Sequence, residues 1–193
     1  MQFFEEKINT EGKVFSGNIL KVDSFLNHQV DVELLEKVAE NFFRAFAEEK
    51  PNKILTVEVS GIPLATLIAS KFRVPMVFAK KIAGANMSED CYSANVYSFT
   101  KKKDYLIKVS KEYLKKSDRV LIVDDFLANG EALRGLLSII NQAGATAVGV
   151  CIAIEKAFQN GGDKLRSEGL KILSAGTIEK MDENGIVFRA DEF

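Results

Sequence analysis

Apolar residues recur every four positions in one early part of the chain. Leu34, Val38, Phe42 and Phe46 follow this spacing, which places them on one face of an α-helix. Asp31 stands just before this stripe, where a side-chain oxygen can cap the first backbone N–H groups of a helix. The pattern therefore predicts an amphipathic helix that begins after Asp31 and ends near residue 49, where a Pro-Asn pair follows.

Short apolar runs alternate with helical patterns along most of the remaining chain. Strands separated by helices are typical of a parallel sheet that is covered on both faces. We therefore expect a single α/β domain over residues 1–193, with a central, mostly parallel sheet flanked by helices. The predicted strands are residues 53–59, 74–79, 120–123, 145–154, 170–173 and 185–189, and the predicted helices after the first are residues 64–71, 133–140 and 163–168.

The stretch from residue 84 to residue 105 interrupts this alternation. Residues 84–90 are small or polar without any period, whereas residues 93–99 and 105–109 alternate polar and apolar positions. This pattern predicts a long loop with a hairpin, an element that often serves as a lid over a site.

Composition and charge exclude several classes of protein. The formal net charge of −1 gives no electrostatic support for a nucleic-acid or membrane-surface role. The two cysteines, Cys91 and Cys151, lack metal-site or disulfide spacing, which is typical of a reducing cytosol. The first residues carry acidic side chains and do not resemble a signal peptide, and the longest apolar stretch, residues 143–154, is too short to span a membrane. We therefore expect a cytoplasmic protein.

Two adjacent carboxylates, Asp124 and Asp125, follow the apolar strand at residues 120–123 and precede a short loop that contains Gly130. Open α/β sheets bind ligands at the carboxyl ends of their strands. Loop N–H groups and a helix N-terminus attract phosphate, whereas carboxylates accept hydrogen bonds from sugar hydroxyls. The segment therefore indicates a site for a phosphorylated sugar, although an ordinary strand with a polar end is the alternative.

This strand–loop–helix segment resembles the phosphoribosyl pyrophosphate (PRPP) signature of type I phosphoribosyltransferases. In many members of that family, threonine hydroxyls in the loop also bind the phosphate, but this chain has Asn129 and Ala132 at those places. The resemblance then implies that backbone N–H groups bind most of the phosphate, with help from the Asn129 amide.

Three further segments indicate which group of phosphoribosyltransferases this chain resembles. Residues 19–29, 125–130 and 154–158 closely resemble the bacterial xanthine phosphoribosyltransferases, and the similarity extends over essentially the whole chain. It implies a hood from about residue 13 to 30, together with a C-terminal segment, in which Leu20 and Asn27 cover the purine. Lys156 would lie beside the base and donate to an exocyclic oxygen.

The same resemblance assigns the sugar and pyrophosphate contacts. Asp124 and Asp125 would hold the ribose hydroxyls. Independently of the resemblance, we expect Lys81 to meet the pyrophosphate, because it is a cation that flanks the predicted lid. The loop at residues 58–63, with Ser60 and Gly61, matches the pyrophosphate loop of the family, although any strand–helix turn with a glycine looks similar. The residues assigned to the 5-phosphate are Ala128, Asn129, Gly130, Glu131 and Ala132.

The reaction implied is purine salvage: xanthine and PRPP give xanthosine 5′-monophosphate (XMP) and diphosphate. The family implies Mg²⁺ carried by PRPP with no direct protein ligand, a homodimer, and neither nucleic acid nor membrane as a partner. Guanine or hypoxanthine, and less readily adenine, are alternative bases. A PRPP-sensing transcriptional regulator is a rival of another class. We expect it less, because the α/β pattern begins too early for the DNA-binding region that such regulators usually carry, and a basic face is lacking.

Simpler structural roles exist for several of these residues. Lys156 read by itself is a surface lysine at a strand end, Asn27 a turn residue and Leu20 a core residue. His28 is the only histidine in the chain, and a structural role suits it better than a catalytic one.

Overall fold

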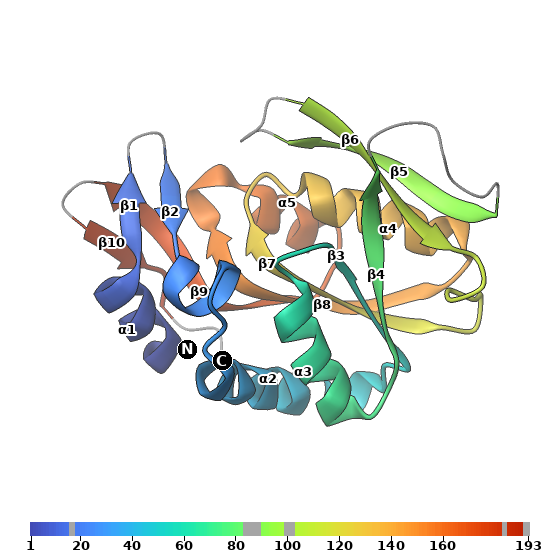
Figure 1. The fold of residues 1–193 in the computed structure, drawn as a ribbon, viewed down its shortest axis with the longest axis horizontal. Helices are drawn as coiled ribbons and strands as arrows, with labels where there is room; N and C mark the ends of the chain where they lie inside the picture. Colours follow the sequence, from blue (N-terminus) through green and yellow to red (C-terminus); the bar gives the residue numbers. More distant parts are fainter. Residues whose placement is uncertain (16–17, 83–89, 99–102, 183–184, 191–193) are drawn as a thin grey trace.

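The fold was analysed in a computed structural model that describes residues 1–15, 18–82, 90–98, 103–182 and 185–190. Within those ranges, an eight-stranded sheet forms the centre of the molecule and a two-stranded sheet stands at one end (Figure 1). The helices are α1 (Gln2–Glu11), α2 (Val32–Phe46), α3 (Ile62–Phe72), α4 (Glu131–Gln142) and α5 (Gly161–Ser167), with shorter turns at η1 (Asp23–Asn27), η2 (Ala47–Glu49) and η3 (Ala157–Gln159).

The large sheet confirms the predicted mostly parallel α/β architecture. Its strand order is β10-β9-β8-β7-β3-β4-β6-β5. The five strands from β9 to β4 run parallel, and antiparallel strands are added at both edges. The strands are β3 (Lys53–Val57), β4 (Met76–Ile82), β5 (Cys91–Ser98), β6 (Lys103–Ser110), β7 (Arg119–Leu127), β8 (Thr146–Lys156), β9 (Ile172–Asp182) and β10 (Gly185–Phe188), and the small sheet pairs β1 (Lys13–Phe15) with β2 (Ile19–Lys21).

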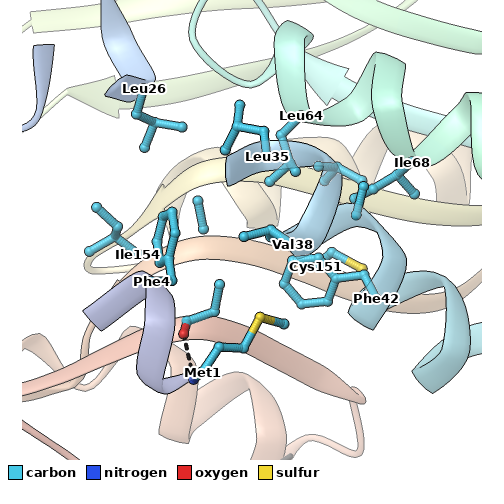
Figure 2. Close-up of a cluster of buried hydrophobic side chains, with 14 of the residues drawn as sticks. Met1, Phe4, Leu26, Leu35, Val38, Phe42, Leu64, Ile68, Cys151 and Ile154 are labelled. Carbon is cyan, nitrogen blue, oxygen red and sulfur yellow. Dashed lines mark hydrogen bonds between the residues drawn. The ribbon is translucent and has the colours of Figure 1, made fainter. Parts of the chain in front are cut away.

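Two hydrophobic clusters cover the two faces of the sheet. One joins the apolar faces of α1, α2 and α3 to β8 and β9, and Figure 2 shows Phe4, Val38, Phe42 and Leu64 converging there. The other cluster packs α4 against the sheet and the β5–β6 hairpin, and it includes Leu165 of α5. Because helices fill both faces, the strand ends between them are the places left for a ligand.

The first predicted helix is confirmed, including its cap. Helix α2 begins at Val32, and the Asp31 carboxylate accepts a 3.1 Å hydrogen bond from the Leu34 N–H. Helix α3 begins at Ile62, two residues earlier than predicted, because Pro63 is tolerated in the first helical turn, where its missing N–H is not needed. The predicted hairpin is present as β5 and β6, while residues 83–89 and 99–102 of the predicted lid lie outside the described residues.

Three local expectations were wrong. Helix α1 was not predicted, because Phe4 and Ile8 are its only buried side chains within residues 2–11 and so give a weak period. The sequence analysis also predicted no helical turn within residues 19–29, but η1 forms one, in which Leu26 N–H donates to the Val22 carbonyl at 3.0 Å. Strand β9 runs to Asp182, far beyond residue 173, because it pairs with β8 and then with β10.

No helix within the described ranges is long and apolar enough to cross a bilayer.

Candidate functional site

The strand–loop–helix segment is present, but its strand is longer than predicted. Strand β7 continues through Leu127, since Phe126 and Leu127 still pair with Ile154 and Glu155 of β8. Asp124 and Asp125 therefore lie within the last residues of the strand, and the loop is confined to residues 128–130. Gly130 adopts a left-handed φ of 88°, a conformation that suits glycine, and its carbonyl accepts the first bond of α4 from Arg134 N–H at 2.8 Å.

Asp124 lies in a buried environment that disfavours its charged form. It is 5% exposed, and its Oδ1 accepts a 3.0 Å hydrogen bond from the Asp125 N–H. Burial and the neighbouring Asp125 carboxylate raise the pKa of Asp124 well above its ordinary value. The pKa of Asp125 is also raised, chiefly by burial. The pair is therefore suited to a ligand that supplies hydroxyl donors or a cation.

The carboxylate oxygens of this pair are the donor type that Mg²⁺ prefers. Within the described residues, however, no three His, Cys, Asp or Glu side chains gather as a metal-binding group. The chain's own donors therefore fit an ion that takes most of its oxygens from a bound ligand or water.

A pocket of about 610 Å³ opens beside this segment. Its volume lies within the range of small-molecule sites, roughly 300–1,000 Å³. Figure 1 places the strands that contribute to it, β7 and β8, in the middle of the sheet, with β2 and η1 at one side and β5 and β6 at the other. Its lining consists of Asn18, Ile19, Leu20, Asn27, Tyr97, Tyr105, Asp124, Phe126, Leu127, Ala128, Asn129, Gly130, Glu131, Ala132, Leu133, Ile152, Lys156 and Gln159.

Lys156 and the N-terminal segment meet at one end of the pocket. The Lys156 Nζ donates a 2.9 Å hydrogen bond to the backbone carbonyl of Asn18 and lies 5.3 Å from the centre of the Phe126 ring. Burial lowers the pKa of Lys156. Lys156 is therefore a partly buried lysine that contacts both Phe126 of β7 and the backbone just before β2.

Asn27 contributes an unsatisfied acceptor to the wall of the same pocket. Its Oδ1 atom is buried and accepts no hydrogen bond. Leaving a buried polar atom without a partner costs roughly 1–3 kcal/mol, so such an atom in a pocket wall indicates a ligand donor. Leu20, the other predicted hood residue, is 6% exposed and belongs to the core cluster as well as to the pocket lining.

Four of the predicted site residues do not line this pocket, although all four are described: Asp125, Lys81, Ser60 and Gly61. The backbone N–H of Lys81 donates at 2.6 Å to Glu58 in the turn after β3, and its Nζ lies 5.3 Å from the Tyr105 ring centre. A Cβ on Gly61 would overlap the Thr56 hydroxyl and lie 3.0 Å from Asp124 Oδ1. The turn at residues 58–61 is therefore packed directly against the acidic pair, next to the pocket.

Several residues of the pocket wall were given no role in the sequence analysis, among them three that carry aromatic or polar groups. Phe126 supplies an aromatic face beside Lys156, Tyr105 of β6 contributes a hydroxyl group, and Gln159 of η3 contributes a side-chain amide. The pKa of Tyr105 is raised by burial and by the Asp124 charge, which places its hydroxyl in the electrostatic field of the acidic pair. The signal available in the sequence was an aromatic residue directly after the acidic pair, which is the position of Phe126. Tyr97 of the predicted hairpin also lines the pocket, whereas the Ser93 backbone pairs with Gln142 of α4.

The family described as "Phosphoribosyl transferase domain" matches residues 21–192. Among curated proteins, the xanthine phosphoribosyltransferase of Alkaliphilus metalliredigens is 50% identical over 192 residues, covering 100% of this chain and 95% of that protein. Xanthine phosphoribosyltransferase 1 of Clostridium perfringens is 49% identical, covering 98% of this chain and 100% of that protein. The xanthine phosphoribosyltransferase of Bacillus cereus is 47% identical, covering 100% of this chain and 98% of that protein.

Solved structures support the fold. The adenine phosphoribosyltransferase of Giardia lamblia, complexed with 9-deazaadenine, superposes with a TM-score of 0.78 at 18% identity, covering 92% of this chain and 98% of that chain. The adenine phosphoribosyltransferase of Rhodothermus marinus gives a TM-score of 0.74 at 17% identity, covering 92% of this chain and 100% of that chain. The resemblance read from the sequence is thus confirmed, and this chain belongs to the phosphoribosyl transferase domain family, with the type I phosphoribosyltransferase fold.

Proposed function

We propose that this chain transfers a 5-phosphoribosyl group from PRPP to xanthine, giving XMP and diphosphate in purine salvage. The observation that carries the proposal is that a donor, Lys156 Nζ, and an unsatisfied acceptor, Asn27 Oδ1, line the same pocket as the strand–loop–helix segment of β7 and α4. The relatives named for xanthine, at 47–50% identity over nearly their full length, add independent support.

The base fits between Lys156 and Asn27. An oxo-purine presents carbonyl acceptors, and the Lys156 ammonium offers only donors. The Asn27 side chain has both a buried acceptor and an amide donor, so it can pair with a ring N–H of xanthine and the adjacent carbonyl. Adenine would place an exocyclic amine against the ammonium. A site that leaves a buried polar group unpaired rejects the wrong ligand strongly.

The sugar phosphate occupies the other end. Backbone N–H groups of residues 128–132 and the first turn of α4 would bind the 5-phosphate, since these groups lack helical partners and carry partial positive charge. Asp124 and Asp125 would accept hydrogen bonds from the ribose hydroxyls. Hydroxyl donors favour the charged form of a carboxylate, which offsets the penalty that burial imposes on Asp124.

The displacement itself requires positioning rather than covalent catalysis. Holding the purine nitrogen against ribose C1 converts a bimolecular step into a unimolecular one, which can supply roughly 7–11 kcal/mol of the barrier. The turn at residues 58–61, with Ser60 and Gly61, and the nearby Lys81 would orient the departing diphosphate. Mg²⁺ carried with PRPP would neutralise charge on the leaving group. A lid over residues 84–105 would exclude water that could hydrolyse the activated sugar.

The organisation of the chain completes the proposal. We place a hood at about residues 13–30, formed by β1, β2 and η1, over the base end of the pocket, with the C-terminal segment beside it. We further propose that the protein is a cytoplasmic homodimer. Light scattering at working concentration, with a mass near twice 21.4 kDa, is the expected result for the dimer.

A comparison of initial rates tests the substrate. Xanthine, guanine, hypoxanthine and adenine are each supplied with PRPP and Mg²⁺, and nucleotide formation is followed by chromatography. Xanthine should give the highest kcat/KM and adenine the lowest. Equal or higher kcat/KM with guanine or hypoxanthine would contradict the assigned base, and no nucleotide with any base would contradict the transferase.

A further inference from the structure

The first residue of helix α5 is in direct contact with the loop at residues 128–130. A Cβ on Gly161, the first residue of α5, would overlap the Ala128 carbonyl oxygen and would lie 2.5 Å from Asn129 C and 2.8 Å from Gly130 N. All three contacts are backbone atoms, which cannot rotate away as a flexible side chain can. The two main chains therefore touch with no side chain between them, and the loop cannot move toward α5.

An enclosed carboxylate fixes the position of this helix. Glu155, the residue before Lys156 in β8, is fully buried. Both of its oxygens accept 2.7 Å hydrogen bonds from Arg166 of α5, and Ser174 of β9 donates at 2.5 Å to Oε2. A Cβ on Gly162 would overlap Glu155 Oε1. A bidentate arginine–carboxylate pair is geometrically specific, so it holds α5 at one orientation against the sheet.

A second ion-pair group ties the exposed side of α5 to the edge of the sheet. Arg189 donates to Asp163 of α5 at 2.9 and 3.2 Å and to Glu179 of β9 at 2.8 Å. Helix α5 is thus attached to β8 and β9, while its first residue presses on the loop.

We propose that Gly161 is a positioning residue for the bound 5-phosphate, and that the Glu155–Arg166 pair acts through α5 to keep Gly161 against the loop. This inference rests on the proposed function, because it takes residues 128–132 as the phosphate-binding segment. A side chain at position 161 displaces the loop N–H groups from the phosphate while leaving the base end of the pocket in place.

Steady-state kinetics of the full-length Gly161→Ala variant provide the test. The KM for PRPP should rise at least ten-fold, while the KM for xanthine changes less than two-fold. Gly169→Ala is the matched control, because Gly169 follows α5 with a left-handed φ of 91° and a Cβ there would meet no atom within 4 Å. That control variant should lower the melting temperature without a selective effect on PRPP.

Arg166→Lys is the second variant, and it carries the same test if Gly161→Ala does not fold. Lysine keeps the charge but cannot form the bidentate pair with Glu155. The KM for PRPP should rise about three-fold or more, again without a matching rise for xanthine. Unchanged KM for PRPP in a folded variant, or equal rises for both substrates, would overturn the inference. Wild-type protein that makes no XMP would instead overturn the proposed function, so the two failures are distinguishable.

Discussion

The two ends of the pocket are built in different ways. The phosphate end is one continuous segment, in which β7, a three-residue loop and α4 follow each other in the chain. The base end joins residues that are far apart in sequence, since Asn18 and Lys156 are separated by 138 positions and meet through a 2.9 Å hydrogen bond. A continuous segment can be recognised as a motif, whereas a site assembled from distant residues depends on the fold.

The two ends also differ in their unsatisfied groups. The phosphate end holds one buried carboxyl group, Asp124, and one partly buried carboxyl group, Asp125, and the pKa values of both are raised. The base end holds an ammonium whose pKa is lowered by burial and an amide oxygen without a donor. Each end therefore retains polar groups that a ligand of complementary charge or hydrogen-bonding pattern would satisfy. Substitutions at one end should change the affinity for one substrate and leave the other almost unchanged.

The largest effect should come from Asp125→Asn. Removing a charged acceptor of ribose hydroxyls should cost about 1.5–3 kcal/mol, or roughly a 10- to 150-fold rise in the KM for PRPP. The KM for xanthine should stay within two-fold. Initial rates at varied PRPP measure this effect, with exposed Glu48→Gln as a matched loss of charge elsewhere. An unchanged KM for PRPP would remove Asp125 from the ribose site.

The reverse pattern is expected for Lys156→Met. Methionine keeps an apolar chain of similar length beside Phe126 but removes the ammonium donor. The affinity for xanthine should fall about ten-fold or more, the value of a lost charged hydrogen bond, while PRPP still binds. Calorimetric titrations of the two ligands measure this directly, and Lys180→Met on the exposed side of β9 is the control. Equal losses for both substrates would mean that the two ends are not independent.

The sequence predicted the phosphate end better than the base end for a physical reason. Strand, acidic pair, glycine and helix each leave a local signal, so residues 120–140 were predicted almost completely. The helix is longer by two residues at each end than predicted, and the end of the strand was misplaced, because β-pairing of Phe126 and Leu127 with β8 is a non-local interaction. The contact between Gly161 and the loop leaves no local signal either, since it depends on how α5 docks.

The base end was predicted through family resemblance rather than through periodicity. Asn27 lies in a π-helical turn that has too few residues to show a period, and Lys156 read by itself is an ordinary lysine at a strand end. Phe126 and Tyr105 were missed because an aromatic residue in a strand fits a core position as well as a pocket wall. Only the folded structure, in which residues of β2, η1, β6, β7 and β8 line one pocket, distinguishes these alternatives.

A smaller effect, on stability, is expected for Asp124→Asn. Because folding raises the pKa of this carboxyl, the folded chain binds its proton more tightly than the unfolded chain does. Stability is therefore lost as the pH rises from the ordinary aspartate range through the raised pKa. A neutral amide removes this loss, so at pH 7 the melting temperature should rise by roughly 2–4 °C, the shift given by about 1 kcal/mol in a domain of this size.

Thermal melts of wild type and Asp124→Asn across a pH series measure this difference. The gain should shrink as the pH falls, because the wild-type carboxyl is then protonated as well. Turnover should decrease in the same variant, since the ribose would lose a charged acceptor. A lower melting temperature at pH 7 would show instead that the ionised carboxylate stabilises the fold, and the phosphate end would then hold no unsatisfied charge.

The smallest effect should come from Arg134→Gln. Arg134 of α4 forms a bidentate pair with Glu168, just beyond α5, at 2.7 and 3.2 Å, but both side chains are about half exposed. Exposed pairs contribute about 0.2–1 kcal/mol and weaken in salt. The melting temperature should fall by no more than about 4 °C at low salt and less at high salt, with the KM for PRPP unchanged. A selective rise in that KM would show that the surface pair, and not only the backbone contact at Gly161, positions the loop. The rigidity of the phosphate end would then depend on ionic strength, which the buried Glu155–Arg166 pair alone would not cause.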